Sequence, residues 1–301
     1  LMRYLSIIFV CIHLLTPPSI LSQTSQPDFT QLRIDQYSRL TIHPAGEQVD
    51  GIALVIHGLN LLPGRMDNVI RELKHRNITS VLLHLKGHAR LESENVGDAR
   101  MNAFKKVSED DWLHQSREGY EHAAELAGAL NVPLYFVGFS MGGLIGPSLL
   151  QNHESIAFEK MILLSPALAI RTHAHLLKTL SFFPGIVIPS SSPEYYRANR
   201  GTPIAAYNAF YKMYGEFRKN VGSERLNISS LLFVHHRDEF ISASGLRRFQ
   251  ERHQLSNWRI KSMAGNESPE DSLFHLIIDE QSAGEDKWKD MWKAVDSLLT
   301  N

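Results

Sequence analysis

Six short runs rich in aliphatic and aromatic residues are the feature that most constrains the fold of this sequence. They span residues 51–56, 80–85, 133–137, 161–164, 231–234 and 258–263. Most are almost continuously apolar, which is typical of strands in a parallel sheet covered by helices on both faces. The segments between them carry apolar residues every three or four positions, as between residues 66 and 73, and predict amphipathic helices. This alternation predicts an α/β domain with a doubly wound, mostly parallel sheet.

The start of one helix can be predicted from its cap. Ser108 and Asp111 have the spacing of a capping box ahead of a helical pattern.

One long segment interrupts the alternation of strands and helices. From residue 167 to about 230 no clear strand is predicted, and nine aromatic residues lie between Phe182 and Phe217. We expect a mostly helical cap inserted over the carboxyl ends of the strands, where open α/β sheets bind ligands. The alternative is that this segment has no role in ligand binding and that its aromatic residues simply pack in the hydrophobic core.

The first residues have the order of a secretory signal peptide. Arg3 precedes an apolar run over residues 5–15, and two prolines and a polar segment follow. The run is shorter than the roughly 20 residues that span a bilayer. We therefore expect residues 1–22 to be removed on export to a periplasm or the exterior, and residues 23–301 to form the folded domain. A retained N-terminal membrane anchor is left open.

Charge and cysteine content exclude several kinds of site. Lys and Arg number 31 against 32 Asp and Glu, so no excess positive charge is present to bind nucleic acid. Cys11 is the only cysteine, which excludes disulfides and cysteine-ligated zinc. His235 and His236 are adjacent and would alternate faces in a strand, and His173 and His175 have no third ligand at suitable spacing. We expect chemistry without a metal or a cofactor.

The pattern G-x-S-x-G is the clearest chemical motif. Gly138-Phe139-Ser140-Met141-Gly142 directly follows a predicted strand and precedes a helical segment. In this context the chain turns too sharply for Cβ atoms at the flanking positions, and the central hydroxyl projects outward. The motif predicts Ser140 as a nucleophile.

A serine nucleophile needs a base, and a base needs an orienting acid. On such a fold these partners follow later strands in the order Ser, Asp or Glu, His. Asp238 lies four residues past the fifth run, and His275 follows the last run and a polar loop over residues 265–271. We assign His275 as the base and Asp238 as the carboxylate that orients it. Glu239 is the alternative acid.

An oxyanion formed at Ser140 would need backbone N–H donors. The first is expected from Met141, at the start of the helix that follows the serine. The second is expected from Leu59, in the turn His57-Gly58-Leu59-Asn60 after the first run. The alternative for His57-Gly58 is an ordinary surface turn.

Taken together, His57-Gly58-Leu59, the segment 138–143, Asp238 and His275 resemble the α/β-hydrolase superfamily. The resemblance covers residues 52–299. It implies the same triad of Ser140, Asp238 and His275, and the same oxyanion donors, Leu59 and Met141.

Three further features are similar to one branch of that superfamily. Lys86-Gly87-His88-Ala89-Arg90, Trp112 and Leu164-Ser165-Pro166 resemble the monoacylglycerol lipase, lysophospholipase and serine-aminopeptidase-like branch. The chain departs from it in the loop after the second run. There His84, Lys86, Ala89 and Leu91 replace a frequent acidic, arginine and glycine pattern. Asn60 replaces a frequent glycine and His235 another. These changes lie near the expected rim of the pocket and leave the triad that the resemblance implies intact.

The function expected from these observations is hydrolysis of a carboxylic ester through an acyl-serine intermediate. The substrate would be a small ester or lipid with an apolar acyl group that fits beneath the cap. Acyl transfer, thioester cleavage and peptide cleavage by the same triad remain alternatives, as does a non-catalytic binding protein. Transient contact of the cap with a membrane or micelle is left open.

Overall fold

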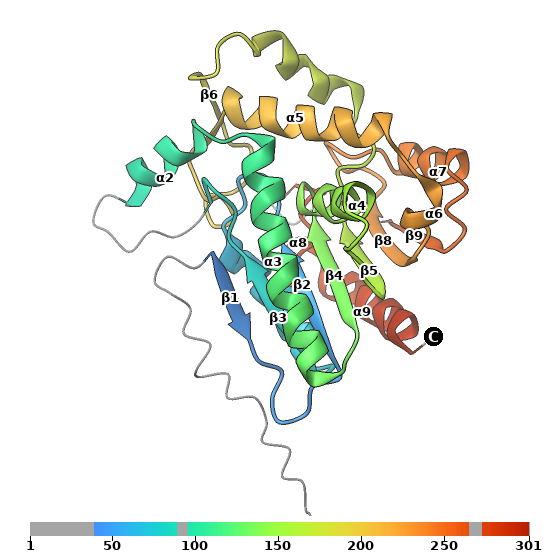
Figure 1. Cartoon of the computed structure of the whole chain (residues 1–301). Helices are drawn as coiled ribbons and strands as arrows, with labels where there is room; N and C mark the ends of the chain where they lie inside the picture. Colours follow the sequence, from blue (N-terminus) through green and yellow to red (C-terminus); the bar gives the residue numbers. More distant parts are fainter. Residues whose placement is uncertain (1–38, 89–95, 265–272, 301) are drawn as a thin grey trace, which may run out of the picture. The chain divides into compact units, whose positions relative to one another are not determined.

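Seven strands form the central sheet among the residues that the computed structural model describes, which are 39–88, 96–264 and 273–300 (Figure 1). The strand order is β1-β3-β2-β4-β5-β8-β9. The strands are β1 (Leu40–His43), β2 (Gly51–Ile56), β3 (Ile78–Leu83), β4 (Leu134–Phe139), β5 (Lys160–Leu164), β8 (Ser229–His235) and β9 (Trp258–Met263). Only β1 is antiparallel to its neighbour, and the other pairs are parallel. The predicted doubly wound, mostly parallel sheet is confirmed.

Several predicted segments lie outside the described residues. These are the signal peptide over residues 1–22, the residues Ala89 and Arg90 of the motif after the second run, and the polar loop 265–271. No helix in the described ranges is long and apolar enough to cross a membrane.

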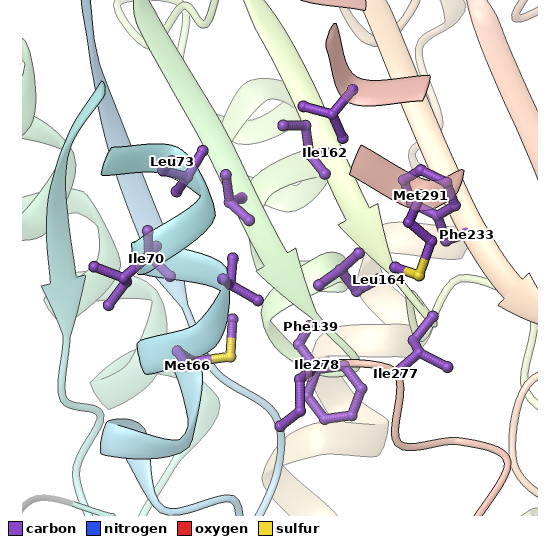
Figure 2. Packing of buried hydrophobic residues seen from close by; sticks show 14 of the residues in the cluster. Met66, Ile70, Leu73, Phe139, Ile162, Leu164, Phe233, Ile277, Ile278 and Met291 are labelled. Carbon is purple, nitrogen blue, oxygen red and sulfur yellow. The ribbon is translucent and has the colours of Figure 1, made fainter. Parts of the chain in front are cut away.

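The sheet is covered on both faces: every residue of β2, β3 and β4 is buried, including the polar Thr79 and Ser80 of β3. On one face, α1 (Asp67–Lys74) and α9 (Glu285–Leu299) pack on alternate strand residues such as Val137, Ile162 and Phe233. Figure 2 shows Met66, Ile70 and Leu73 turned toward the strands, and Met291 beside Phe233. The short helices η1 (Pro63–Met66) and α8 (Glu280–Ala283) belong to this side.

The opposite face is covered by α3 (Glu109–Leu130) and α4 (Gly142–Asn152) (Figure 1). The predicted capping box is present at the start of α3. The Ser108 hydroxyl accepts from the N–H of Asp111 at 3.2 Å, and the N–H of Ser108 donates to the Asp111 carboxylate at 2.8 Å. Asn131 ends α3 in the left-handed conformation. The remaining helices outside the inserted segment are α2 (Val96–Phe104) and α7 (Ala243–Arg252).

The segment between β5 and β8 holds both helices and strands. Its elements are η2 (Thr172–Leu180), β6 (Val187–Pro189), β7 (Gly201–Pro203), α5 (Ile204–Lys219) and α6 (Ser223–Leu226). β6 and β7 form a separate antiparallel pair. The sequence did not predict these strands, because each has only three residues and ends in proline. In Figure 1, α5 lies across the end of the sheet beside α4.

Candidate active site

Ser140 lies in the turn between β4 and α4. Its φ is +52°, in the left-handed region that non-glycine residues seldom adopt. Two backbone hydrogen bonds hold it there. Its N–H donates to the carbonyl of Leu164 at 2.9 Å, and its carbonyl accepts from the N–H of Ala167 at 3.0 Å. The chain leaving β5 therefore keeps the serine in a strained conformation.

The glycines that flank Ser140 are required by close backbone contacts. A Cβ on Gly142 would collide with the backbone of Ile56 and His57. A Cβ on Gly138 would lie 2.7 Å from the backbone of Gly142. The sequence argument that side chains do not fit at these positions is confirmed.

The structure brings Ser140, His275 and Asp238 together in one chain of hydrogen bonds. Ser140 Oγ lies 2.8 Å from His275 Nε2, although 135 positions separate the two residues. His275 Nδ1 lies 2.8 Å from Asp238 Oδ2. A carboxylate only accepts, so Nδ1 carries the proton and Nε2 is left to accept from the serine hydroxyl.

Asp238 is fully buried but remains surrounded by donors. Its Oδ1 accepts from the N–H groups of Phe240 and Ile241, both at 2.8 Å. Burial alone would raise the pKa of Asp238. Electrostatic interaction with the His275 ring and its hydrogen bond, together with the two N–H groups, outweigh burial and lower that pKa. The carboxyl is therefore ionised at neutral pH.

Glu239, the alternative acid, has a different position. Its two carboxylate oxygens accept from the N–H groups of Phe274 and His275, each at 3.0 Å. It thus holds the main chain that carries the imidazole, while Asp238 contacts the ring itself. The geometry favours Asp238 as the orienting acid.

The two expected oxyanion donors flank Ser140. Met141 is the N-cap residue of α4 and is fully buried. Leu59 borders the same cavity as Ser140, and its neighbour Gly58 packs so closely that a Cβ there would lie 3.1 Å from Ser140 Cβ. The turn 57–60 is therefore part of the site and not a separate surface turn.

Two buried histidines hold the turn that contains Leu59. His88 Nε2 accepts from the N–H of Asn60 at 2.8 Å, and His57 Nε2 accepts from the N–H of Leu85 at 3.2 Å. Burial lowers the pKa of His88 to about 3 and the pKa of His57 well below its ordinary value. Both rings are neutral at physiological pH, as their role as acceptors requires.

An amide pair ties the same turn to the segment between β5 and β8. Asn60 has φ +55°, and its side chain donates to the Asn199 carbonyl at 3.0 Å and accepts from the Asn199 N–H at 2.9 Å. The Asn199 side chain donates to the carbonyl of Gly87 at 2.9 Å. Sequence reasoning noted Asn60 only as a departure and missed Asn199. Asn60 and Asn199 are 139 positions apart, so no local sequence pattern predicts their contact.

A cavity of about 510 Å³ opens above Ser140 and His275. Its walls are mostly apolar and come from η2, α5 and the loops after β8 and β9. They include Leu177, Tyr207, Phe210, Tyr211, Ile241 and Leu276. Ser140 and His275 therefore border an apolar chamber large enough for a small organic ligand.

Two of the four histidines considered for a metal site, His235 and His236, have other contacts. His236 Nδ1 lies 3.1 Å from the carbonyl of Met263, and the His235 ring stacks on Phe274. Within the described part of the chain, no group of three His, Cys, Asp or Glu side chains is placed to hold a metal ion.

Residues 47–216 match the family profile described as serine aminopeptidase, S33. The chain belongs to the serine aminopeptidase S33 family of α/β-hydrolases. A comparison with curated protein sequences gave no significant match to this chain.

Solved structures similar to this S33-family chain have low sequence identity to it. A soluble variant of monoglyceride lipase from Saccharomyces cerevisiae, with a substrate analogue, is 15% identical with a TM-score of 0.67 over 86% of this chain and 91% of that one. The monoacylglycerol lipase of Paleococcus ferrophilus is 17% identical, with a TM-score of 0.62 over 87% of this chain and 98% of the lipase. A metagenome-derived lipolytic enzyme is 15% identical, with a TM-score of 0.63 over 87% of this chain and 98% of that enzyme. These likenesses establish the α/β-hydrolase fold.

Proposed function

We propose that this α/β-hydrolase cleaves carboxylic esters with apolar acyl groups through an acyl-Ser140 intermediate. The observation that carries the proposal is the pair of 2.8 Å contacts from Ser140 Oγ to His275 Nε2 and from His275 Nδ1 to Asp238 Oδ2. Ser140 and His275 both line the apolar cavity.

In the first half of the reaction, His275 Nε2 takes the proton of the Ser140 hydroxyl as Oγ attacks the ester carbonyl carbon. The carbonyl oxygen becomes an oxyanion, which the N–H groups of Leu59 and Met141 stabilise by about 3 kcal/mol each. Ionised Asp238 stabilises the imidazolium. The bond to the alcohol oxygen then breaks, and the His275 Nε2 proton passes to that oxygen.

In the second half, water replaces the alcohol. His275 takes a proton from the water as its oxygen attacks the acyl-Ser140 carbonyl, and a second oxyanion forms at the same N–H groups. Its collapse breaks the bond to Oγ, which takes back the proton from Nε2. The products are a carboxylic acid and the free hydroxyl of Ser140.

The cavity walls support an apolar acyl group. Leu177, Phe210 and Leu276 would surround an alkyl or aryl chain whose carbonyl lies at Ser140. The similar solved structures named as monoglyceride lipases favour the same class of substrate. In this proposal, η2 and α5 act as the cap predicted for residues 167–230.

Exposed apolar side chains support contact of the cap with lipid aggregates. Phe182 and Phe183 are 87% and 58% exposed, and Leu176 of η2 is 67% exposed. Exposed apolar side chains of this kind, one of which also lines the cavity, favour a surface that contacts a micelle or membrane. Export after cleavage of residues 1–22 belongs to the same proposal, and N-terminal sequencing of the mature protein tests it.

Active-site labelling and a substrate series test the enzymatic proposal. A fluorophosphonate probe is expected to label the wild-type chain and not Ser140→Ala. On p-nitrophenyl esters of increasing chain length, kcat/KM is expected to rise to a maximum, and aminoacyl p-nitroanilides are expected to be poor substrates. Equal labelling of Ser140→Ala would refute the nucleophile. A flat chain-length profile, or preference for the anilides, would refute the apolar-ester proposal in favour of the peptidase alternative.

A further inference from the structure

A second cavity, of about 800 Å³, adjoins the one above Ser140. The two cavities share Ile170, His173 and Leu176 as wall residues. The second cavity is also lined by the last turns of α5 and by one face of α7. It therefore lies where the segment between β5 and β8 meets the loop that carries Asp238.

Four arginines line this second cavity, and we call it the basic cavity. Arg171 precedes η2, Arg218 is near the end of α5, and Arg248 and Arg252 lie on α7. On α7 the cavity-facing residues are spaced three and four positions apart, as expected for one helix face. They are Gly245, Arg248, Phe249 and Arg252.

The positive charge of the basic cavity is not balanced by acidic side chains in the described ranges. No Asp or Glu lines it. None of the ion pairs formed within those ranges includes these four guanidinium groups. Arg248 and Arg252, one helical turn apart, repel each other and weaken α7 slightly. The neighbouring His253 experiences the same field, since its pKa is lowered first by burial and then by Arg218 and Arg252.

Two of the guanidinium groups are held in place before any ligand arrives. Arg218 lies over the Phe249 ring, 5.0 Å from its centroid. Arg171 donates from Nε to the Asp238 carbonyl at 2.6 Å and from a terminal nitrogen to the His236 carbonyl at 3.2 Å. Preorganised donors lose less conformational entropy on binding. Arg171 also joins the basic cavity to the main chain of Asp238.

We propose that the basic cavity binds a phosphate monoester group. Guanidinium groups pair with phosphate oxygens through two parallel hydrogen bonds, and a doubly charged phosphate can engage several of them at once. A singly charged carboxylate would leave most of the four unpaired. The volume exceeds that of a phosphate ion, so the group would be attached to a larger molecule. The source is either a soluble phosphate ester or an anionic lipid headgroup.

Calorimetric titration of the full chain with inorganic phosphate and with glycerol 3-phosphate at low ionic strength tests the proposal. The double variant Arg248→Gln/Arg252→Gln removes two exposed cavity charges, and Arg247→Gln is the matched control, since Arg247 is exposed on α7 outside the cavity. Wild type and Arg247→Gln are expected to bind both probes equally. The double variant is expected to bind at least about tenfold more weakly, and added salt to weaken binding in every case.

A vesicle arm distinguishes the two sources. Cosedimentation compares neutral phosphatidylcholine vesicles with vesicles that also contain phosphatidic acid. A phosphatidic-acid preference that is lost in the double variant supports the cavity as a headgroup site. Binding of the soluble probes, with vesicle binding that does not depend on Arg248 and Arg252, supports it as a site for a soluble ester.

Two results would overturn the assignment. One is equal binding of every phosphate probe by the double variant and by Arg247→Gln. The other is no binding of the soluble probes together with no preference for phosphatidic acid. Ser140→Ala is expected to bind the probes as wild type does, so the outcome is independent of the proposed ester hydrolysis.

Discussion

At the scale of single residues, two neighbouring acids take different positions in the site. Asp238 contacts the imidazole of His275, whereas Glu239 holds the backbone of Phe274 and His275. Their order in the sequence made both candidates for the orienting acid. The hydrogen bonds place Asp238 on the ring and Glu239 on the main chain, which favours Asp238 as the orienting acid.

The substitution Asp238→Asn tests this assignment. An amide nitrogen facing His275 Nδ1 would favour the tautomer with its proton on Nε2, which cannot accept from Ser140. We expect kcat on a p-nitrophenyl ester to fall by about 10³- to 10⁴-fold. Glu239→Gln is the matched control and should lose far less, because its remaining amide oxygen still accepts one backbone N–H. Wild-type turnover in a folded Asp238→Asn variant would refute the assignment.

A pH dependence of stability follows from His88. Its pKa is about 3 in the folded chain against an ordinary value of 6.5, because burial disfavours the charged ring. Between these values the unfolded chain binds more protons, so the stability that the neutral ring contributes is complete above pH 6.5 and is lost as pH falls toward 3. The slope is up to about 1.4 kcal/mol per pH unit. Chemical denaturation of His88→Gln at pH 7, 6, 5 and 4 should show a shallower loss of stability than wild type. The exposed His122→Gln should match wild type, and an unchanged slope in His88→Gln would contradict the buried neutral ring.

At the scale of elements, the turn from β4 to α4 depends on one glycine packed against another strand. Gly142 lies against the backbone of Ile56 and His57 at the end of β2, so β2 and α4 approach too closely for a side chain. The strained φ of Ser140 is maintained by this packing and by the bonds to Leu164 and Ala167.

Two alanine substitutions at helical glycines should have opposite effects. Gly142→Ala is expected to destabilise the fold by about 3 kcal/mol or more, because backbone atoms must move to admit the methyl group. Gly128→Ala, at an exposed site in α3 with no atom near the added Cβ, is expected to stabilise it by roughly 0.5–1 kcal/mol. Urea unfolding measures both. A Gly142→Ala variant as stable as wild type would show that the close approach is not needed.

At the scale of the whole molecule, the apolar cavity is assembled from distant parts of the chain. Leu59 follows β2, Phe210 comes from α5, and Leu276 follows β9. The sheet brings the ends of its strands together, and the segment between β5 and β8 supplies the wall opposite them. The size of this chamber should therefore set the preferred acyl length.

Phe210→Ala should shift that preference. Removing the ring enlarges the cavity, so kcat/KM for a longer acyl ester should rise relative to a short one by about tenfold. Phe182→Ala removes an exposed ring that does not line the cavity and should leave the profile on soluble short esters unchanged. The measurement is a series of p-nitrophenyl esters. An identical profile for Phe210→Ala and wild type would place the acyl group elsewhere.

Local patterns in the sequence were sufficient for six of the seven strands of the central sheet, the capping box and the sharp turn at Ser140. Strand and helix periodicities and glycine positions act over a few residues, so they can be read without knowledge of the fold. β6 and β7 were not predicted because each has three residues and ends in proline, and β1 was not predicted because its four residues, Leu-Thr-Ile-His, lack the continuous apolar run of most of the other strands. The roles of Ser140, Asp238 and His275 stay predictions, now with a hydrogen-bonded geometry that fits them.

The sequence by itself determined the class of fold and the serine at its sharpest turn, since both depend on neighbours along the chain. Only the tertiary structure placed Asp238 against the His275 ring and Glu239 against the main chain beside it, joined Asn60 to Asn199, and gathered four arginines from separate elements around one cavity. Such contacts form between residues far apart in the sequence. Their energy depends on distances that exist only once the sheet, helices and loops have packed together.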